Sequence, residues 1–301
     1  MSENRERCDV GLKKQQGIQS VKFEEPPIIC AAASVVGKKE GDGPFGDVFD
    51  QIESDPKVGG DTWEDAEGRL QERAAELAIQ KAGCGKEAIR YIVAGDLLGQ
   101  LMASSFGLAG FDKPLFGVYG ACSTMGESIG IGSMLVEGGF ADYVLAMTSS
   151  HFASAEKQFR FPLGYANQRP KASTWTVTGS GAVVICKGDQ KQGMAKITGI
   201  TTGKIVDYGV KDTMNMGACM APAAASVVAA HFKDFGTDPS EYDQIITGDL
   251  GMVGKDILID ILRSEGYDIA DRYIDCGIEI YGRDAQAQAG GSGCGCSAVM
   301  L

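Results

Sequence analysis

Apolar residues in the first two thirds of the chain form short continuous runs separated by stretches with helical spacing. The runs are typical of strands buried in a sheet, and they cover residues 28–33, 91–94, 115–121, 143–147 and 181–185. Between these runs, helical spacing predicts helices over 62–82, 98–108 and 124–136. Strands that alternate with helices predict an α/β fold whose mostly parallel sheet is covered on both faces.

The same order of signals returns in the last third of the chain. Strands are expected near 195–200 and 244–250, with helices over 221–235 and 256–263. The tripeptide Gly-Asp-Leu that ends the strand at Asp96 recurs at Asp249, and the segment around Cys122 resembles the one around Cys294. Two copies of one βα layout predict a duplicated, pseudo-twofold molecule.

The duplication suggests where the parts of the chain begin and end. We expect a flexible tail over 1–25, an N-terminal half over 26–190 and a C-terminal half over 191–301. The first half continues for 63 residues from Cys122 to Ile185, whereas five residues follow Cys296. We therefore expect the second half to be incomplete at its C-terminal end.

Charge and composition exclude several classes of protein. The net charge of −12 argues against nucleic acid as a partner, because a phosphate backbone requires a Lys/Arg surface. We find no transmembrane segment and no signal peptide, so the protein is expected on the cytoplasmic side of a membrane. The nine cysteines are scattered and lack metal-ligand spacing, which predicts reduced thiols and no metal site.

Cys122 is the residue best placed for chemistry. It lies where a strand is expected to turn into a helix, so the backbone N–H groups of Ser123 and Thr124 would favour an anion. The same setting lowers the pKa of a thiol. The alternative is a small buried residue that fills a tight turn.

The sequence around Cys122 also carries a family resemblance. Residues 120–124, Gly-Ala-Cys-Ser-Thr, followed by a helix of small residues, resemble the nucleophile elbow of thiolases and ketoacyl synthases. Further stretches resemble the stage V sporulation protein AD (SpoVAD) family, and they are residues 148–151, 158–162, 177–184, 220–225 and 290–294. The resemblance implies a thiolase-like fold in which two duplicated halves form α-β-α-β-α layers.

Two departures from the condensing enzymes concern the partners of the cysteine. Asp249 stands where the resemblance would place a catalytic His, and residues 290–294 lack the second His or Asn. A carboxylate near Cys122 would raise the pKa of the thiol rather than lower it. Claisen-type condensation is therefore not expected.

Four other residues are candidates for ligand contacts, and each has a structural alternative. His151 follows a strand and could bond an anion or Cys122, or be a loop histidine whose bonds are satisfied elsewhere. Asp96 and Asp249 end matching strands, where they could contact a ligand or cap the next helix. Arg160 lies between two aromatic residues and could bind a carboxylate, or remain a solvated charge.

The resemblance implies a protein that binds dipicolinic acid, pyridine-2,6-dicarboxylate, as part of the SpoVA system. It would act in uptake of the acid into the developing spore and in its release at germination. The expected ligand-binding residues are Cys122, Ser123, Thr124, His151, Asp96, Arg160 and Asp249. Phe152 or Tyr165 could pack on the pyridine ring.

The resemblance also implies partners and a location. No cofactor is expected, although calcium could accompany dipicolinate. The expected partners are other SpoVA membrane proteins, at the periphery of the spore or forespore membrane, with a homodimer left open. Two alternative functions remain: an acyltransferase with Cys122 as nucleophile and His151 as base, or a non-catalytic scaffold of a membrane channel complex.

Overall fold

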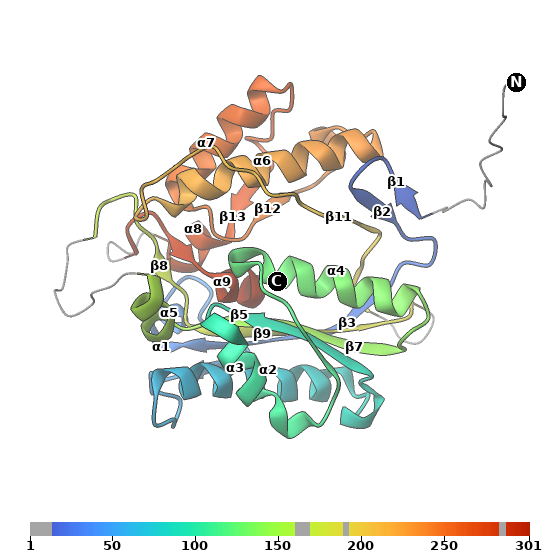
Figure 1. Cartoon of the computed structure of the whole chain (residues 1–301), viewed down its shortest axis with the longest axis vertical. Helices are drawn as coiled ribbons and strands as arrows, with labels where there is room; N and C mark the ends of the chain where they lie inside the picture. Colours follow the sequence, from blue (N-terminus) through green and yellow to red (C-terminus); the bar gives the residue numbers. More distant parts are fainter. Residues whose placement is uncertain (1–13, 160–168, 189–192, 283–286) are drawn as a thin grey trace, which may run out of the picture.

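Five layers of helices and strands, in the order α-β-α-β-α, make up the molecule (Figure 1). The computed structural model describes residues 14–159, 169–188, 193–282 and 287–301. The helices that form the layers are α2 (Trp63–Ala82), α3 (Met102–Gly107), α4 (Thr124–Glu137), α9 (Cys294–Met300), α6 (Met216–Phe235) and α7 (Gly251–Ser264). Helices α2 and α3 cover one face of the large sheet, and α4 and α9 cover the other. The predicted thiolase-like layering is confirmed.

The large sheet has the strand order β10-β3-β9-β7-β5-β6, with β4 also paired to β3. Its strands are β3 (Ile28–Gly37), β4 (Gln51–Glu53), β5 (Tyr91–Asp96), β6 (Leu115–Gly117), β7 (Tyr143–Ser150), β9 (Gly179–Cys186) and β10 (Ala195–Lys196). Strands β7, β5 and β6 run parallel, whereas β9 is antiparallel to both β7 and β3. The sheet is therefore mixed rather than mostly parallel, because the chain re-enters at Gly179 beside Ser150, where β7 ends.

Strand β9 shows why a buried strand appears in the sequence as a continuous run of apolar residues. All its residues are buried, and its side chains alternate between two cores. Ala182 and Val184 pack in the core that includes α2 residues, whereas Val183 and Ile185 pack in the core that includes α4 residues. Helices on both faces therefore favour apolar side chains over residues 182–185 of this strand.

Local sequence signals fix both ends of helix α2, almost where the sequence predicted them. Thr62 is its N-cap and accepts a hydrogen bond from the Asp65 backbone N–H at 3.1 Å. Gly83 ends the helix with φ of 58°, the left-handed conformation that glycine adopts most readily.

Other boundaries differ from the sequence expectations. The stretch 98–108 is broken because Gln100 and Leu101 adopt positive φ, which separates a 3₁₀ turn, η2 (Gly99–Leu101), from α3. The strand expected over 115–121 ends at Gly117. Helix α6 begins at Met216, five residues before the expected start, because the Asn215 side chain caps it by accepting from the Ala218 N–H.

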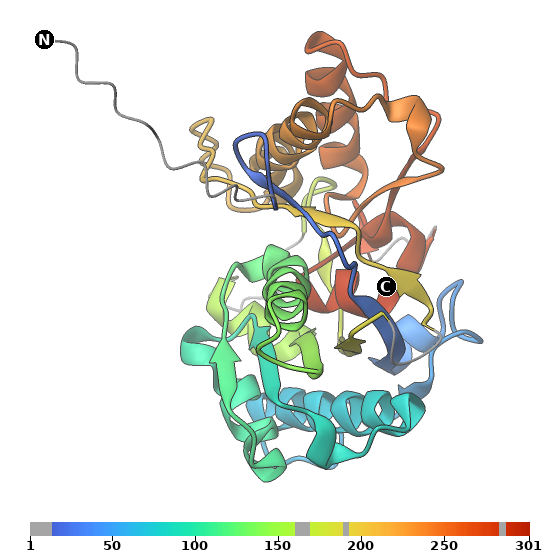
Figure 2. The ribbon, with the colours of Figure 1, turned by 90° about the vertical axis from the view of Figure 1, so that its right-hand side faces the viewer.

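Part of the expected flexible tail is ordered. Strands β1 (Gln15–Gln16) and β2 (Ser20–Lys22) fall inside 1–25, and β2 pairs with β11 (Gly199–Thr201). The expected strand over 195–200 is thereby divided, since β10 joins the large sheet and β11 joins β2. Figure 2 shows β2 and β11 between the first-half sheet and the helices of the second half. Residues 1–13 lie outside the described part of the chain.

The second half contributes a smaller sheet and the contact between the halves. Its strands β12 (Ile245–Thr247) and β13 (Tyr273–Asp275) are parallel. Short elements follow: α8 (Cys276–Tyr281), and β14 (Gly291–Ser292), which pairs with β8 (Trp175–Thr176) of the first half. Helix α9 then packs on β9, so a second-half helix completes the core of the first half.

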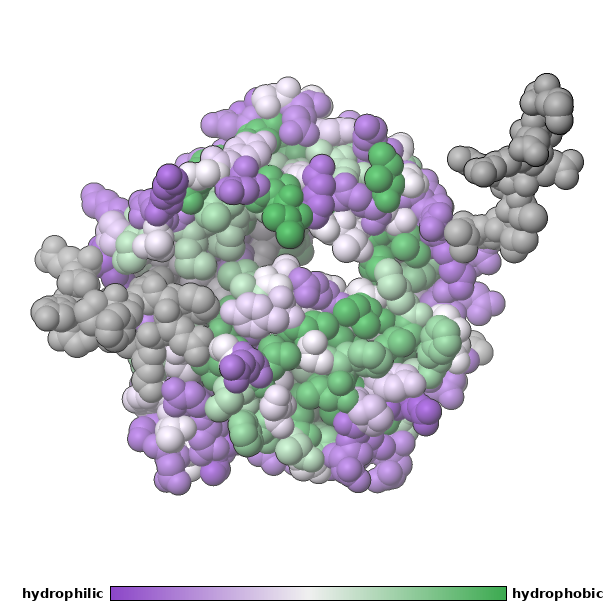
Figure 3. Space-filling model, in the orientation of Figure 1, coloured by the Kyte–Doolittle hydropathy of each residue, from purple (hydrophilic) through white to green (hydrophobic). Residues whose placement is uncertain are grey.

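Two surface features complete the description. Apolar residues gather over α4 on the face shown in Figure 3, and Met134 of this helix and Phe140 after it are exposed. Among the described residues, no helix is long and apolar enough to cross a membrane. The cysteines of these residues are free thiols.

Candidate functional site

Cys122 lies at a sharp turn between β6 and α4. It sits in the 3₁₀ turn η4 (Ala121–Ser123), and Ala121 adopts φ of 52°. This conformation is uncommon for a residue other than glycine, so the surrounding packing must hold the turn in place. The predicted elbow is therefore present, with a half-buried thiol.

Two segments of the second half reach this thiol. The loop after β12 brings Asp249, whose carboxylate lies close enough to the Cys122 thiol to raise the pKa of that thiol. The turn before α9 brings Gly293, whose backbone N–H donates to Asp249 Oδ2 at 2.9 Å. Asp249 is 5% exposed, and burial raises its pKa to about 6. Cys122, Asp249 and Gly293 thus lie together in one cluster at the junction of the halves, in which Gly293 and Asp249 are joined by a hydrogen bond.

The electrostatic environment keeps Cys122 protonated. Burial raises the pKa of the Cys122 thiol well above its ordinary value, and the negative charge of Asp249 raises it further. The backbone N–H of Gly293 opposes this shift. Helix α4 begins next to the thiol, but the effect of its N-terminus does not prevail over burial and the carboxylate. A thiol that stays protonated is a weak nucleophile.

Ser123 and Thr124 hold the turn itself. The Ser123 hydroxyl donates to Gly120 O at 3.0 Å and lies 2.7 Å from Glu127 Oε1. The Thr124 hydroxyl donates to Ala121 O at 2.7 Å and accepts from the Gly120 N–H. Both side chains therefore have partners within the elbow, and Glu127 adds a second carboxylate beside it.

His151 is buried in an aromatic stack at the end of β7. Its ring centroid lies 5.6 Å from that of Trp63 and 5.2 Å from that of Phe152. Nε2 is 2.8 Å from Pro56 O, and the Ala153 N–H donates to Nδ1 at 3.1 Å. A carbonyl only accepts and an amide N–H only donates, so His151 is the neutral Nε2–H tautomer. Because the Nδ1 lone pair is engaged, the imidazole is unsuited to act as base for Cys122.

Asp96, the other candidate that the structure describes, has its hydrogen-bond partners in its own loop. Asp96 is buried and accepts from the Leu98 N–H at 2.9 Å and from the Ser104 N–H at 2.8 Å, so it stabilises its own loop. Asp96 and Asp249 occupy matching places in the duplication but have different partners. Arg160 and Tyr165 lie outside the described residues.

A buried polar network lies beneath the site and was not predicted. Glu67 of α2 is fully buried and accepts hydrogen bonds from the hydroxyls of Ser149 and Ser154 at 2.9 and 2.6 Å. Burial raises the pKa of Glu67 to about 8, so the carboxyl is largely neutral at pH 7. One turn later, Gln71 donates to Ser149 Oγ at 2.8 Å. Glu67 and Gln71 are four residues apart on the apolar face of α2, a signal that the sequence contained.

The network reaches the elbow region through another cysteine. The Cys294 thiol donates to Ser149 O at 2.9 Å.

In the described part of the chain, no group of three or more His, Cys, Asp or Glu residues could hold a metal ion.

Sequence comparison shows one clear family match. The family model for stage V sporulation protein AD (SpoVAD) matches residues 17–301. The stage V sporulation protein AD of Bacillus subtilis (strain 168) is 45% identical over 287 residues, which cover 95% of this chain and 84% of that protein.

The solved structures that resemble this fold include condensing enzymes. A cerulenin-bound variant of OleA from Xanthomonas campestris has a TM-score of 0.61 and 15% identity, with 93% of this chain and 87% of that chain covered. A 3-oxoacyl-(acyl carrier protein) synthase III, FabH, from Xanthomonas oryzae pv. oryzae has a TM-score of 0.59 and 16% identity, with 93% and 90% covered. At these identities the likeness establishes the fold alone.

Proposed function

The chain belongs to the SpoVAD family of sporulation proteins, and from that premise we propose that it binds dipicolinic acid. In this proposal the protein takes part in uptake of the acid into the developing spore and in its release at germination. The proposal requires no cofactor, and calcium could accompany the acid. The protein works at the periphery of the spore or forespore membrane with other SpoVA proteins.

The observation that carries a binding role, rather than catalysis, is the pairing of Cys122 with Asp249. A condensing enzyme needs a thiolate that attacks an acyl group, and donors that stabilise the developing oxyanion. Here the carboxylate raises the pKa of the thiol, and the negative charge next to it would repel an oxyanion. We therefore infer that this protein has the fold of the condensing enzymes but does not catalyse their condensation reaction.

Calorimetric titration of dipicolinate into the full chain, with and without calcium, tests the proposal. We expect saturable binding with a stoichiometry near one per chain. Circular dichroism and a cooperative urea transition establish that the sample is folded. A folded chain that takes up no dipicolinate under either condition would contradict the proposal and favour the scaffold.

A second experiment separates binding from acyl transfer. The protein is incubated with acyl-coenzyme A thioesters of several chain lengths and its intact mass is recorded. We expect no adduct, because Cys122 stays protonated. A mass increase equal to the acyl group, lost in Cys122→Ser, would identify an acyltransferase instead.

A further inference from the structure

Glu67 joins three elements of the first half through hydroxyl groups. Its carboxyl projects from α2 and contacts Ser149 at the end of β7 and Ser154 of α5 (Phe152–Phe159), with O···O distances of 2.9 and 2.6 Å. All three side chains are at most 1% exposed. Helix α5 is therefore linked to α2 by a hydrogen bond that lies away from solvent.

The hydrogen bonds around two buried carboxyls decide which of them carries the charge. Asp96 accepts from the backbone N–H groups of Leu98 and Ser104 and from the Ser104 hydroxyl. Among the described residues, the partners of Glu67 are hydroxyls alone. Amide donors that point at a carboxylate stabilise its ionised form, so the charge belongs on Asp96 and the proton on Glu67.

The charges nearest to Glu67 are negative. Burial is the largest cause that raises its pKa, to about 8, and the charge of Asp96 on β5 raises it further, as does that of Glu64 on α2. An ionised Glu67 would therefore be a buried anion beside other anions, which is unfavourable.

The titratable groups of the other elements near Glu67 do not offset this effect. From α9, the Cys294 thiol is neutral, because burial raises its pKa well above the ordinary value. On α5, Glu156 pairs with Arg169 at 2.7 Å, and His151, just before this helix, is neutral. Each of these groups favours a neutral Glu67 or is balanced by a partner of its own.

The proton of Glu67 sets the direction of the bonds to α5. Gln71 Nε2 donates to Ser149 Oγ, so the Ser149 proton goes to Glu67 Oε1. A neutral Glu67 therefore carries its proton on Oε2 and donates it to Ser154, whose own proton goes to His151 O at 3.1 Å. When Glu67 is ionised, Ser154 donates to Oε2 instead, and its bond to His151 O is lost.

An unpartnered acceptor lies on the same face of α2. Gln71 is fully buried, and its Oε1 has no hydrogen-bond partner among the described residues. Gln71 follows Glu67 by one turn of the helix, so the two side chains are neighbours. A buried acceptor without a donor is costly and favours the entry of water once a neighbouring element moves.

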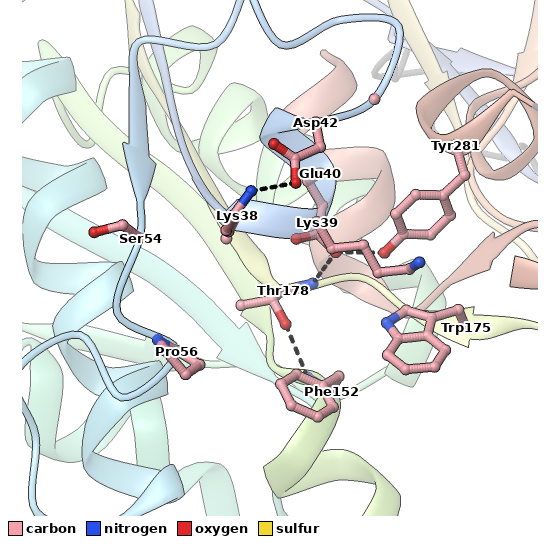
Figure 4. Close-up of a pocket in the computed structure, with 12 residues that line it drawn as sticks. Lys38, Lys39, Glu40, Asp42, Ser54, Pro56, Phe152, Trp175, Thr178 and Tyr281 are labelled. Atoms are coloured by element: carbon pink, nitrogen blue, oxygen red, sulfur yellow. Dashed lines mark hydrogen bonds and ion pairs between the residues drawn. The ribbon is translucent and has the colours of Figure 1, made fainter. Parts of the chain in front are cut away.

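Helix α5 is the element that moves at the least cost. Ser149 lies in β7, which is paired on both sides, to β5 and to β9, and α2 has 20 residues. By contrast, α5 has eight residues. At its start, the Phe152 N–H donates to Thr178 Oγ1 at 3.1 Å (Figure 4). Few bonds therefore need to break for α5 to leave α2.

We propose that Glu67 is a protonation switch that holds or releases α5. The neutral carboxyl fixes the start of α5 against α2 through Ser154. Loss of the proton favours a state in which α5 has moved away and water reaches the carboxylate. This switch is additional to dipicolinate binding and does not depend on it.

Release of α5 would reach the contact between the two halves. The Phe152 ring stacks on that of Trp175, with centroids 5.8 Å apart, and Figure 4 shows both rings. Trp175 lies in β8, which pairs with β14 of the second half. Loss of a proton in the first half would therefore loosen a contact that the second half makes.

Release of α5 should increase with pH. The pKa of Glu67 is about 8 when α5 is in place, whereas in the released state water reaches the carboxyl and its pKa returns to about the ordinary 4.5. The ratio of released to bound α5 therefore rises about tenfold per pH unit between about pH 4.5 and 8, and levels off above 8.

Hydrogen exchange of the full chain, followed by mass spectrometry at pH 5.5 and 7.5, tests the switch. Exposure times are matched to the intrinsic exchange rate at each pH. We expect protection of residues 152–159 to fall at least about tenfold over this interval. In Glu67→Gln, which stays neutral, protection should be the same at both pH values. The matched control is Glu72→Gln, exposed on the same helix, which should behave like the parent chain.

Urea separates release of α5 from unfolding of the whole chain. A local opening exposes little surface, so at pH 7.5 the exchange of residues 152–159 should change little at low urea concentrations. Residues 144–147 of β7, buried in the sheet, should exchange through global unfolding and accelerate steeply.

Two outcomes in the parent chain would overturn the switch, whether or not Glu67→Gln folds. One is protection of residues 152–159 that does not change with pH. The other is a urea dependence of these residues equal to that of residues 144–147, since Glu67 would then act through global unfolding alone.

Discussion

At the scale of single residues, the surroundings of one thiol decide the chemical character of the elbow. Burial raises the pKa of Cys122, and the negative charge of Asp249 raises it further. Gly293 holds that carboxylate in place through its backbone N–H. The cluster is thus built to keep a proton on sulfur rather than to remove it.

Replacement of Asp249 by Asn should make Cys122 more reactive. Burial raises the pKa of the Cys122 thiol most, and the charge of Asp249 raises it further, so loss of that charge lowers the pKa while burial still holds it above the ordinary value. Each pKa unit removed raises the thiolate fraction about tenfold. The rate of iodoacetamide alkylation of Cys122, followed by peptide mass against pH, measures the shift. Asp260→Asn, exposed on α7, is the control; identical profiles for all three proteins would contradict the prediction.

Glu67 should make stability depend on pH. Its pKa is about 8 in the folded chain against 4.5 for the ordinary group. Stability from the neutral carboxyl is complete below about pH 4.5 and is lost as pH rises through 8, because the unfolded chain ionises first. At about 1.4 kcal/mol per pKa unit, the loss is on the order of 5 kcal/mol.

Urea unfolding of Glu67→Gln at pH 5 and pH 8 checks this prediction. The amide stays neutral and can bond Ser149 and Ser154, so the variant should lose less stability between the two pH values than the parent chain. Glu72→Gln, exposed on the same helix, should behave like the parent. An equal loss in the parent and Glu67→Gln would show that Glu67 does not titrate in this range.

At the scale of elements, the carboxylate of Asp234 holds the turn between β1 and β2 against the second half of the chain. Asp234 of α6 accepts from the backbone N–H groups of Ile18 and Gln19 at 3.0 and 2.9 Å, and from the Ser20 hydroxyl at 2.9 Å. These donors lower the pKa of Asp234. The turn between β1 and β2 is therefore held by a side chain more than 200 residues away.

Asp234→Ala should release this turn. Backbone amides of Ile18 and Gln19 lose their acceptor, so their hydrogen exchange should accelerate at least about tenfold. Because the pKa of Asp234 is lowered, the parent chain should show the same release only as pH falls through that lowered value. Exchange measured by mass spectrometry over residues 14–22 tests this, with exposed Asp243→Ala as control; unchanged exchange in Asp234→Ala would reject the role.

At the scale of the whole molecule, α9 joins the two halves. It packs on β9, and one apolar cluster contains Val36 and Val177 from the first half with Ile280 and Val299 from the second. The halves share a core and should unfold together. Helix α9 approaches strand β9 closely because Gly181 of β9, which has no side chain, lies at the contact.

Gly181→Ala should separate α9 from β9. A Cβ at this position would lie 2.0 Å from Ala298 O, a backbone atom that cannot move without shifting the helix. We expect a loss of roughly 1–3 kcal/mol or more in the free energy of unfolding, measured in urea. Gly126→Ala is the matched control, since its Cβ meets nothing within 4 Å, and it should be neutral or slightly stabilising. Equal stability of the two variants would contradict the tight contact.

The sequence alone determined much of the fold and the chemical character of the elbow. Helical periodicity placed α2 and α4, and apolar runs placed β3, β5, β7 and β9, because these signals are local. The resemblance to condensing enzymes also placed Asp249 where a catalytic His would be expected. The direction in which Asp249 shifts the pKa of the Cys122 thiol was predicted from this position, although burial is the larger cause of the raised pKa.

Only the tertiary structure decided how distant side chains pair. His151 bonds to Pro56, 95 residues away, and Glu40 bonds to Tyr281, 241 residues away. No local pattern encodes such pairs, so the sequence left two alternatives open for His151 and did not predict the contact between Glu40 and Tyr281. The ordered β2 strand was missed for the same reason, because its partners, β11 and Asp234, lie in the second half. Local periodicity fixes the elements, whereas a site made from both halves exists only once the chain has folded.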